Sequence, residues 1–208
     1  MSNLETIELG ENVRVSDPCY DDDVWCKTKL EGVLPGKYKV DVNFSDEGAW
    51  GTRVSKLTVI HQDYVNTPLG WEDYDTIGVD SGQAGIFCES SYRKDSIAAD
   101  IETENVNFNL GDYRKEDAGG DEWYEKMCRL TLSKNSWGAY PTGVVTSSGF
   151  GDGSYPLDVA RNDEDKIVGI TITYIEPEDE WEDEEDEGDV CPVCGETNAD
   201  GESCNCQE

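Results

Sequence analysis

The sequence predicts a mainly β protein, an antiparallel β-sandwich or barrel-like domain with few short helices, followed by an acidic linker and a small cysteine module. Between residues 6 and 175, apolar residues recur in short alternating runs bounded by Gly, Pro, Asn and Asp. This pattern is typical of half-buried strands. From Glu176 onward the chain has 15 acidic residues and neither Lys nor Arg, and four cysteines lie close to its end.

Taken in order, the alternating runs predict ten strands. They cover residues 6–9, 13–16, 37–44, 53–61, 76–80, 85–88, 126–133, 142–147, 155–161 and 166–175. The last two flank the polar sequence Asn-Asp-Glu-Asp, which predicts a closing β-hairpin. Residues 93–122 are polar and poorly patterned, so we expect a long loop there with one short helical turn.

The composition divides the chain into three parts. With 208 residues it can form one well-buried domain plus an appendage. We place the β-rich body at residues 1–175. Residues 176–190 form an acidic linker, because eleven of the fourteen residues from 176 to 189 are acidic and cannot bury enough apolar surface to fold. Residues 191–208 form the cysteine module.

The charge of the chain restricts its partners. Asp and Glu number 47 against 16 Lys and Arg, which gives a formal net charge of −31, and residues 1–175 alone carry −16. Such a field repels nucleic acid and anionic membranes and attracts basic proteins. We therefore expect a basic protein surface as partner, with neither direct nucleic-acid binding nor a membrane.

The first residues lack a basic segment followed by an apolar run, and no stretch reaches the length of a membrane span. These features predict a soluble cytoplasmic protein. In the cytoplasm, thiols that are reduced or bound to metal are the expected state of its eight cysteines.

The C-terminal cysteines have the spacing of a zinc site. Cys191 and Cys194 form a C-x2-C pair, and Cys204 and Cys206 supply a second pair after a nine-residue loop. Four thiolates favour tetrahedral Zn²⁺ in a structural role, because no coordination position remains open for water. The second pair is C-x-C where a zinc ribbon has C-x2-C, and a reduced or disulfide-bonded tail is the alternative.

The remaining candidates for metal and anion chemistry have ordinary structural explanations. Cys19, Cys26, Cys88 and Cys128 lack ligand spacing and are expected to be buried small apolar residues. The single histidine, His61, is expected to be structural or solvated. The sequence Gly-Phe-Gly-Asp-Gly at 149–153 lacks the Lys of a phosphate loop, so we expect a turn with positive φ at Gly151 or Gly153.

Aromatic residues near turns and strand ends suggest a ligand-binding rim or a protein-binding patch. Together with one carboxylate, the candidates are Tyr20, Trp25, Trp50, Trp137, Tyr140, Asp152 and Tyr155. The alternative is that several of these rings cap the ends of the core. The arginines at 14, 53, 93 and 129 would either pair with carboxylates or line a pocket for an anionic ligand.

Four stretches, taken together and in this order, carry a resemblance to a known family. They are SDPCY at 16–20, LPGKYKVDV at 34–42, IGVDSGQAGIF at 77–87 and GFGDGSYPLDVARNDEDKIVGI at 149–170. The chain resembles an uncharacterised family of bacterial and phage proteins catalogued as a domain of unknown function. The resemblance implies a compact β-rich fold and a bacterial host cell, and it brings no activity.

Three functions follow as hypotheses. The first is a non-enzymatic acidic interaction protein that engages a basic partner, as a phage or bacterial accessory or counter-defence factor, with DNA mimicry as a variant. The second is a β-rich domain that binds or sequesters a small anionic ligand such as a nucleotide signal. The third is a hydrolase that uses Asp17, Asp80 and Asp152, although turn capping also explains these three residues.

Overall fold

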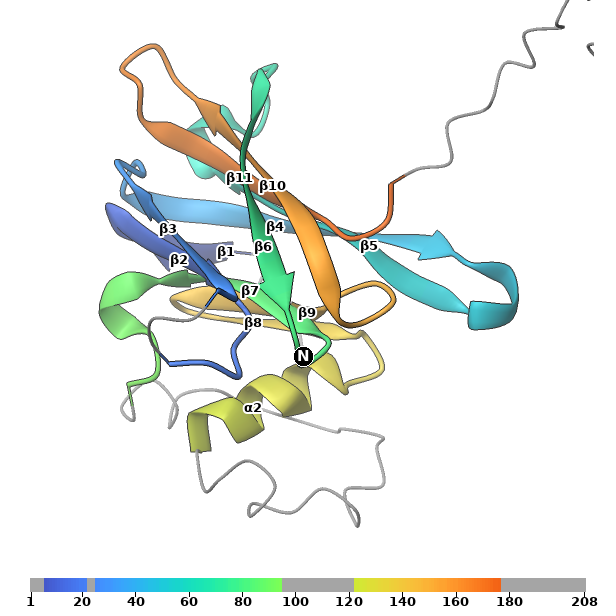
Figure 1. The fold of residues 1–208 in the computed structure, drawn as a ribbon. Helices are drawn as coiled ribbons and strands as arrows, with labels where there is room; N and C mark the ends of the chain where they lie inside the picture. The colour runs from blue at the N-terminus through green and yellow to red at the C-terminus, as the bar shows by residue number, and fades with distance from the viewer. Residues whose placement is uncertain (1–5, 22–24, 95–121, 177–208) are drawn as a thin grey trace, which may run out of the picture. The chain divides into compact units, whose positions relative to one another are not determined.

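The computed structural model describes residues 6–21, 25–94 and 122–176 (Figure 1). The strands are β1 (Thr6–Leu9), β2 (Asn12–Ser16), β3 (Lys27–Glu31), β4 (Gly36–Asp46), β5 (Thr52–His61), β6 (Trp71–Val79), β7 (Gln83–Cys88), β8 (Trp137–Tyr140), β9 (Gly143–Ser147), β10 (Gly153–Arg161) and β11 (Ile167–Thr173). The helix α2 (Glu122–Thr131) and three short 3-10 turns, η1 (Gly48–Trp50), η2 (Gln62–Tyr64) and η3 (Glu89–Ser91), complete the described elements.

Two antiparallel sheets form the body. Sheet A has the strand order β1-β4-β5-β11-β10-β6, and sheet B has the order β3-β2-β7-β9-β8. Figure 1 shows the two sheets as stacked layers, with α2 below sheet B. The predicted mainly β fold is confirmed, and it is an open sandwich.

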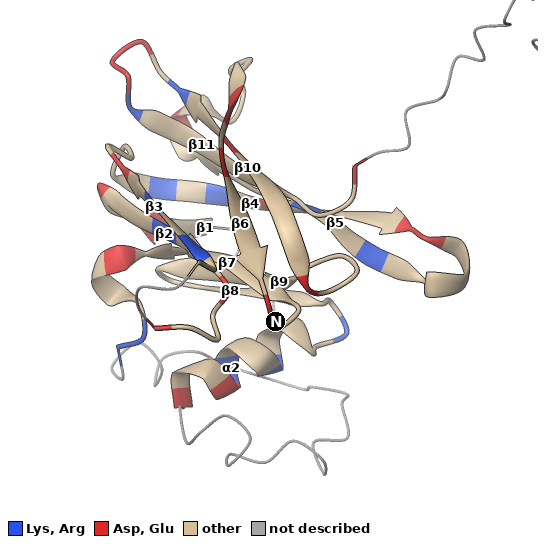
Figure 2. Ribbon diagram, viewed as in Figure 1, with Lys and Arg blue, Asp and Glu red and all other residues tan. Residues whose placement is uncertain are grey.

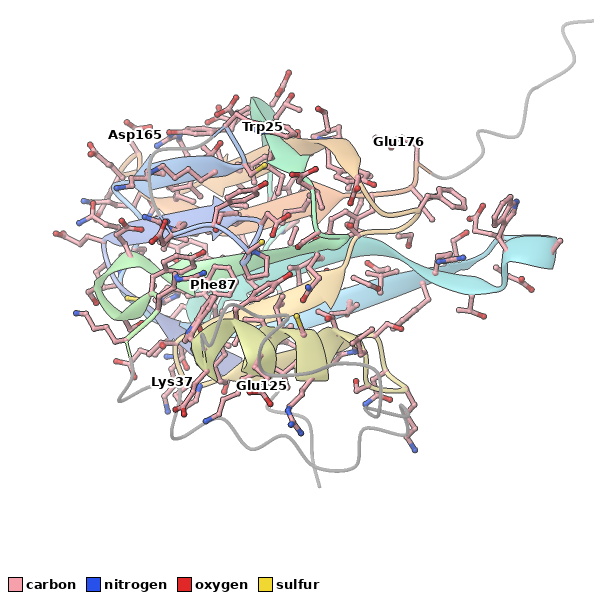
Figure 3. The ribbon with its side chains drawn as sticks, turned by 60° about the horizontal axis from the view of Figure 1, so that its bottom comes forward. Trp25, Lys37, Phe87, Glu125, Asp165 and Glu176 are labelled. Carbon is pink, nitrogen blue, oxygen red and sulfur yellow. The ribbon has the colours of Figure 1, made fainter. Side chains whose placement is uncertain are left out.

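The core lies between the two sheets because strands of both contribute their apolar faces. Leu57, Ile77 and Ile172 of sheet A and Val15 and Ile86 of sheet B belong to one buried cluster. The alternation that predicted strands in the sequence is therefore the alternation of core and solvent faces. A second cluster, which includes Phe87, Trp123 and Tyr140, lies between α2 and the other face of sheet B. Figure 3 shows Phe87 beside the helix.

The closing hairpin is confirmed, with β10 paired to β11 across a short turn. Asn162 organises this turn, because its side-chain oxygen accepts hydrogen bonds from the backbone N–H groups of Glu164 and Lys166. Asp165 adopts a positive φ of 61°, a conformation that Asp tolerates better than most residues.

One predicted strand is wrong. Residues 126–133 lie mostly in α2 and not in a sheet. The buried residues of this helix are Trp123, Met127, Cys128 and Thr131, which recur every three to four positions as on one helical face. The prediction also missed β3, β8 and the first five residues of β6, where charged or small residues interrupt the apolar alternation.

The chain divides into two units, residues 1–176 and 177–208. The second unit, which includes most of the predicted linker and all of the cysteine module, lies outside the described residues, as does most of the predicted loop at 93–122. Within the part of the chain that the structure describes, no helix has the length and apolarity needed to cross a membrane.

Candidate functional site

The 80–82 turn, which joins β6 of sheet A to β7 of sheet B, is held by a buried carboxylate. Asp17 is 0% exposed. One of its oxygens accepts hydrogen bonds from the backbone N–H groups of Asp80 and Ser81, at 2.8 and 2.7 Å. The other accepts the Ser81 hydroxyl at 2.6 Å and the Cys19 N–H at 2.8 Å. Four donors explain why this charge is buried.

The loop between β9 and β10 meets the same turn from the opposite side. Asp152 accepts a hydrogen bond from the Gly82 N–H at 3.0 Å, and the Ser148 N–H donates to the Gly82 carbonyl. Gly151 has a φ of 112°, as the sequence predicted, whereas the other positive φ in this loop falls at Gly149 and not at Gly153.

Four of the seven predicted ligand-binding residues lie around this turn. The Tyr20 hydroxyl donates to the Asp80 carboxylate, which raises the Tyr20 pKa to about 12. Trp25 lies against Gly78 of β6, so closely that a Cβ at this glycine would meet its ring, and it remains 64% exposed. Asp152 caps the turn as described. The Tyr155 hydroxyl donates to two carbonyls of the neighbouring loop, at 148 and 151.

The other three candidates lie elsewhere. Trp50 ends the η1 turn between β4 and β5 and is 70% exposed. Trp137 is half-buried against the main core. Tyr140 is 2% exposed and packs against Phe87 beneath α2. The structure therefore brings four of the aromatic and carboxylate candidates together and separates the other three.

The predicted hydrolase residues Asp17, Asp80 and Asp152 also meet at this turn. Asp17 and Asp152 accept hydrogen bonds from backbone N–H groups of the turn, as capping residues do. Asp80 accepts a hydrogen bond from the Tyr20 hydroxyl. Because the Asp17 carboxylate already accepts four hydrogen bonds, these contacts favour the structural explanation that the sequence also offered.

Two arginines stabilise the loops beside the turn. Arg14 is buried and forms a bidentate pair with Glu89, which lowers the Glu89 pKa to about 2. The Arg14 guanidinium also lies 4.2 Å from the centre of the Tyr92 ring. Arg93 donates to the Pro18 carbonyl. Pairing with a carboxylate is thus the role that the structure shows for Arg14, whereas the pocket for an anionic ligand stays a prediction.

Four thiols lie within the described residues, and two of them have raised pKa values. Cys26, Cys88 and Cys128 are buried as predicted, but Cys19 is exposed. Burial of the Sγ atoms raises the pKa of Cys19, and it raises that of Cys26 to about 11, whereas reactive thiols have lowered pKa values.

The structural role predicted for His61 agrees with its surroundings. Its side chain is buried, accepts a hydrogen bond from the Asp63 N–H, and packs edge-on against Tyr38. Gly36 is required beside it, because a Cβ there would lie 2.5 Å from the His61 Nε2 atom.

Sequence reasoning missed a polar row on the outer face of sheet A. The pairing register places Asp41, Thr58, Thr171, Asp158 and Asp73 side by side on β4, β5, β11, β10 and β6. The two threonine hydroxyls are hydrogen-bonded at 2.7 Å. Burial and then the neighbouring charge of Asp73 raise the pKa of Asp158. We call this set the outer row.

Beside the outer row lies an exposed aromatic ring. Trp71 of β6 is opposite Ala160 of β10, and its ring lies over Gly169 of β11, where a Cβ would be 2.8 Å from it. Trp71 remains 41% exposed. In the sequence, Trp71 and Asp73 are two positions apart, which indicates only that they share one face of a strand. The sequence does not indicate that this strand pairs with β10.

Among residues 6–21, 25–94 and 122–176, no group of three or more His, Cys, Asp or Glu side chains is placed to hold a metal ion. The predicted zinc ligands Cys191, Cys194, Cys204 and Cys206 lie outside the described residues.

Comparison with known proteins gives one result. A family model described as a protein of unknown function, DUF4241, matches residues 12–172. No curated protein and no solved structure matches the chain at a significant level. The match covers sheet B, nearly all of sheet A except β1, the 80–82 turn and the outer row.

Proposed function

The chain belongs to the DUF4241 family, whose function is unknown, and from that premise we propose that it is a non-enzymatic binding protein whose acidic surface engages a basic protein partner. The net charge of −31 supports this proposal at the level of the whole chain. The outer row, with Trp71 beside it, supports it at the level of the surface.

One observation carries the proposal. Asp73 and Asp158 are directly opposite each other on β6 and β10, where like charges destabilise a sheet. Figure 2 shows both basic and acidic positions along the strands of sheet A. The charge of Lys56 lowers the Asp158 pKa but does not outweigh burial and Asp73. A Lys or Arg side chain from a partner would relieve this repulsion and could lie against the Trp71 ring.

A labelled octalysine peptide tests the proposal, with affinity measured by fluorescence anisotropy at increasing NaCl. We expect salt-dependent binding that becomes about fivefold weaker at low salt in the variant Asp73→Asn/Asp158→Asn, because one exposed and one half-buried charge together contribute on the order of 1 kcal/mol. Neutralising the acidic residues of the linker should weaken binding further, since a dense polyanion raises the encounter rate.

The matched control is Glu8→Gln/Glu11→Gln, which removes two exposed charges in and just after β1, the edge strand of sheet A opposite to the edge strand β6 that carries Asp73. If both double variants weaken binding equally, the effect is one of net charge, and the outer row has no special role. Affinity that does not change with salt would contradict the proposal as a whole.

Two finer elements belong to the same proposal. The resemblance to bacterial and phage proteins supports an accessory or counter-defence role. In its DNA-mimic variant, the carboxylates would stand in for phosphates, and the chain would then compete with DNA for its partner. The zinc module would serve as a structural unit.

A small anionic ligand at the 80–82 turn is the second candidate, favoured by the gathering of Tyr20, Trp25, Asp152 and Tyr155 beside the cation of Arg93. A panel of labelled nucleotides tests it. Binding that Trp25→Ala reduces and the linker substitutions leave unchanged would favour this candidate over the first.

A further inference from the structure

The hairpin formed by β4 and β5 extends beyond the sandwich. β1 pairs with β4 only over residues 36–39, and β11 pairs with β5 only over residues 56–60. Residues 44–54 pair only with each other, and Figure 1 shows them as the cyan ribbon that projects past the other strands. We call residues 44–54 the ribbon.

The apolar side of sheet A continues along the ribbon without its cover. Phe44 is directly opposite Val54, so the two side chains share one face. Val54 is 1% exposed and belongs to the main core, whereas Phe44 is 47% exposed. Trp50, at the end of the ribbon, is 70% exposed. Among the described residues, the layer that covers Val54 therefore does not extend over Phe44.

The base of the ribbon is fixed to the body. The Ser55 carbonyl accepts hydrogen bonds from the backbone N–H groups of Tyr174 and Ile175, at 2.7 and 3.1 Å. An isolated two-stranded ribbon is only marginally stable, and an uncovered Phe and Trp add to the exposed apolar area. The fold thus retains a costly feature that a bound partner would stabilise.

Acidic side chains border the uncovered rings. Asp46 is exposed and lies two positions after Phe44 on β4, so the two side chains are on the same face. Glu47 follows Asp46 in the turn. The cation of Arg53 donates to the Trp50 carbonyl. By alternation with Val54, Arg53 belongs to the opposite face. The surface is therefore apolar with an acidic border.

From these observations we propose that the uncovered face of the ribbon binds an amphipathic basic helix of a partner protein. Packed layers are separated by about 10 Å, which is also the diameter of a helix with its side chains. A helix could thus take the place of the missing layer, with its apolar stripe on Phe44 and Trp50 and its Lys or Arg residues near Asp46 and Glu47.

A second copy of this chain fits the surface less well. The net charge of −31 opposes self-association, and the apolar side of α2 is already buried against sheet B. The proposal rests on the proposed function, since it names the form in which a basic partner is recognised.

The probe is a labelled amphipathic helical peptide of about 15 residues made of Leu and Lys, compared with octalysine on the full chain. We expect Phe44→Ser/Trp50→Ser to weaken binding of the Leu/Lys peptide about tenfold or more, because the apolar contacts are lost. Octalysine affinity should change less than twofold. The control Phe150→Ser/Leu132→Ser removes two other exposed apolar side chains and should leave both affinities unchanged.

The single variant Trp50→Ser, at an exposed turn, repeats the measurement with the least risk to folding. Equal affinity of the Leu/Lys peptide for the wild type and the ribbon variants would overturn the inference, as would equal loss in the control. Sedimentation equilibrium that shows dimers abolished by Trp50→Ser would overturn it in favour of a second copy. If octalysine does not bind to the wild type, this result would instead contradict the proposed function.

Discussion

At the scale of single residues, Asp17 has the largest structural role among the candidates. Its replacement by Ala leaves the N–H groups of Cys19, Asp80 and Ser81 without their acceptor. We expect Asp17→Ala to lower the free energy of unfolding by about 3–5 kcal/mol, measured by urea denaturation. Asp152→Ala, which loses one bond at an exposed site, should cost about 1 kcal/mol. Similar losses for the two variants would contradict the capping role of Asp17.

The sequence identified these aspartates as candidates but did not indicate that they lie at the same turn. An Asp before Pro and an Asp before Ser-Gly are local turn signals, readable from neighbouring residues alone. That Asp17 caps a turn 63 and 64 residues away depends on how the two sheets pack. A tertiary contact of this kind has no local signature. Turn capping by these residues could therefore be predicted, but the contact that joins them at one turn could not.

At the scale of elements, α2 shows where local patterns fail. Met127, Cys128, Leu130 and Leu132 give a short apolar run that fits a strand as well as a helix. The deciding residue is Trp123, four positions before the run begins at Met127. Its side chain is 1% exposed and packs against Phe87, so it extends the buried face of the helix toward the N-terminal end.

Removing this ring tests the helix. Trp123→Ala should lower the free energy of unfolding by about 3–5 kcal/mol, because it leaves a large cavity between α2 and sheet B. Lys126→Ala, on the same helix but outside its buried set, should change it by less than about 0.5 kcal/mol. Urea denaturation followed by circular dichroism compares the two. A loss below about 1 kcal/mol for Trp123→Ala would mean that the helix does not cover this cluster.

At the scale of the whole molecule, the zinc module is testable by metal analysis of the full chain. We expect about one Zn²⁺ per chain, because four thiolates suffice for a tetrahedral site. Cys191→Ser/Cys204→Ser should release the metal, whereas Cys19→Ser/Cys128→Ser, which alters two thiols of the body, should retain it. Zinc that persists in the first variant and disappears in the second would place the site in the body.

The class of the fold was predictable from the whole chain, but its topology was not. Alternation and turn residues indicate strands and their solvent faces, and these predicted a mainly β domain that is either a sandwich or barrel-like. Strand order depends on the tertiary packing of apolar faces that are far apart in the sequence. Nothing in Ile167–Thr173 itself indicates that β11 lies between β5 and β10.

The central position of β11 has a consequence during protein synthesis. β11 is the last strand of the body to leave the ribosome, and until it does, β5 and β10 have open edges that can pair with other chains. Sheet A can therefore close only when nearly the whole body has been translated.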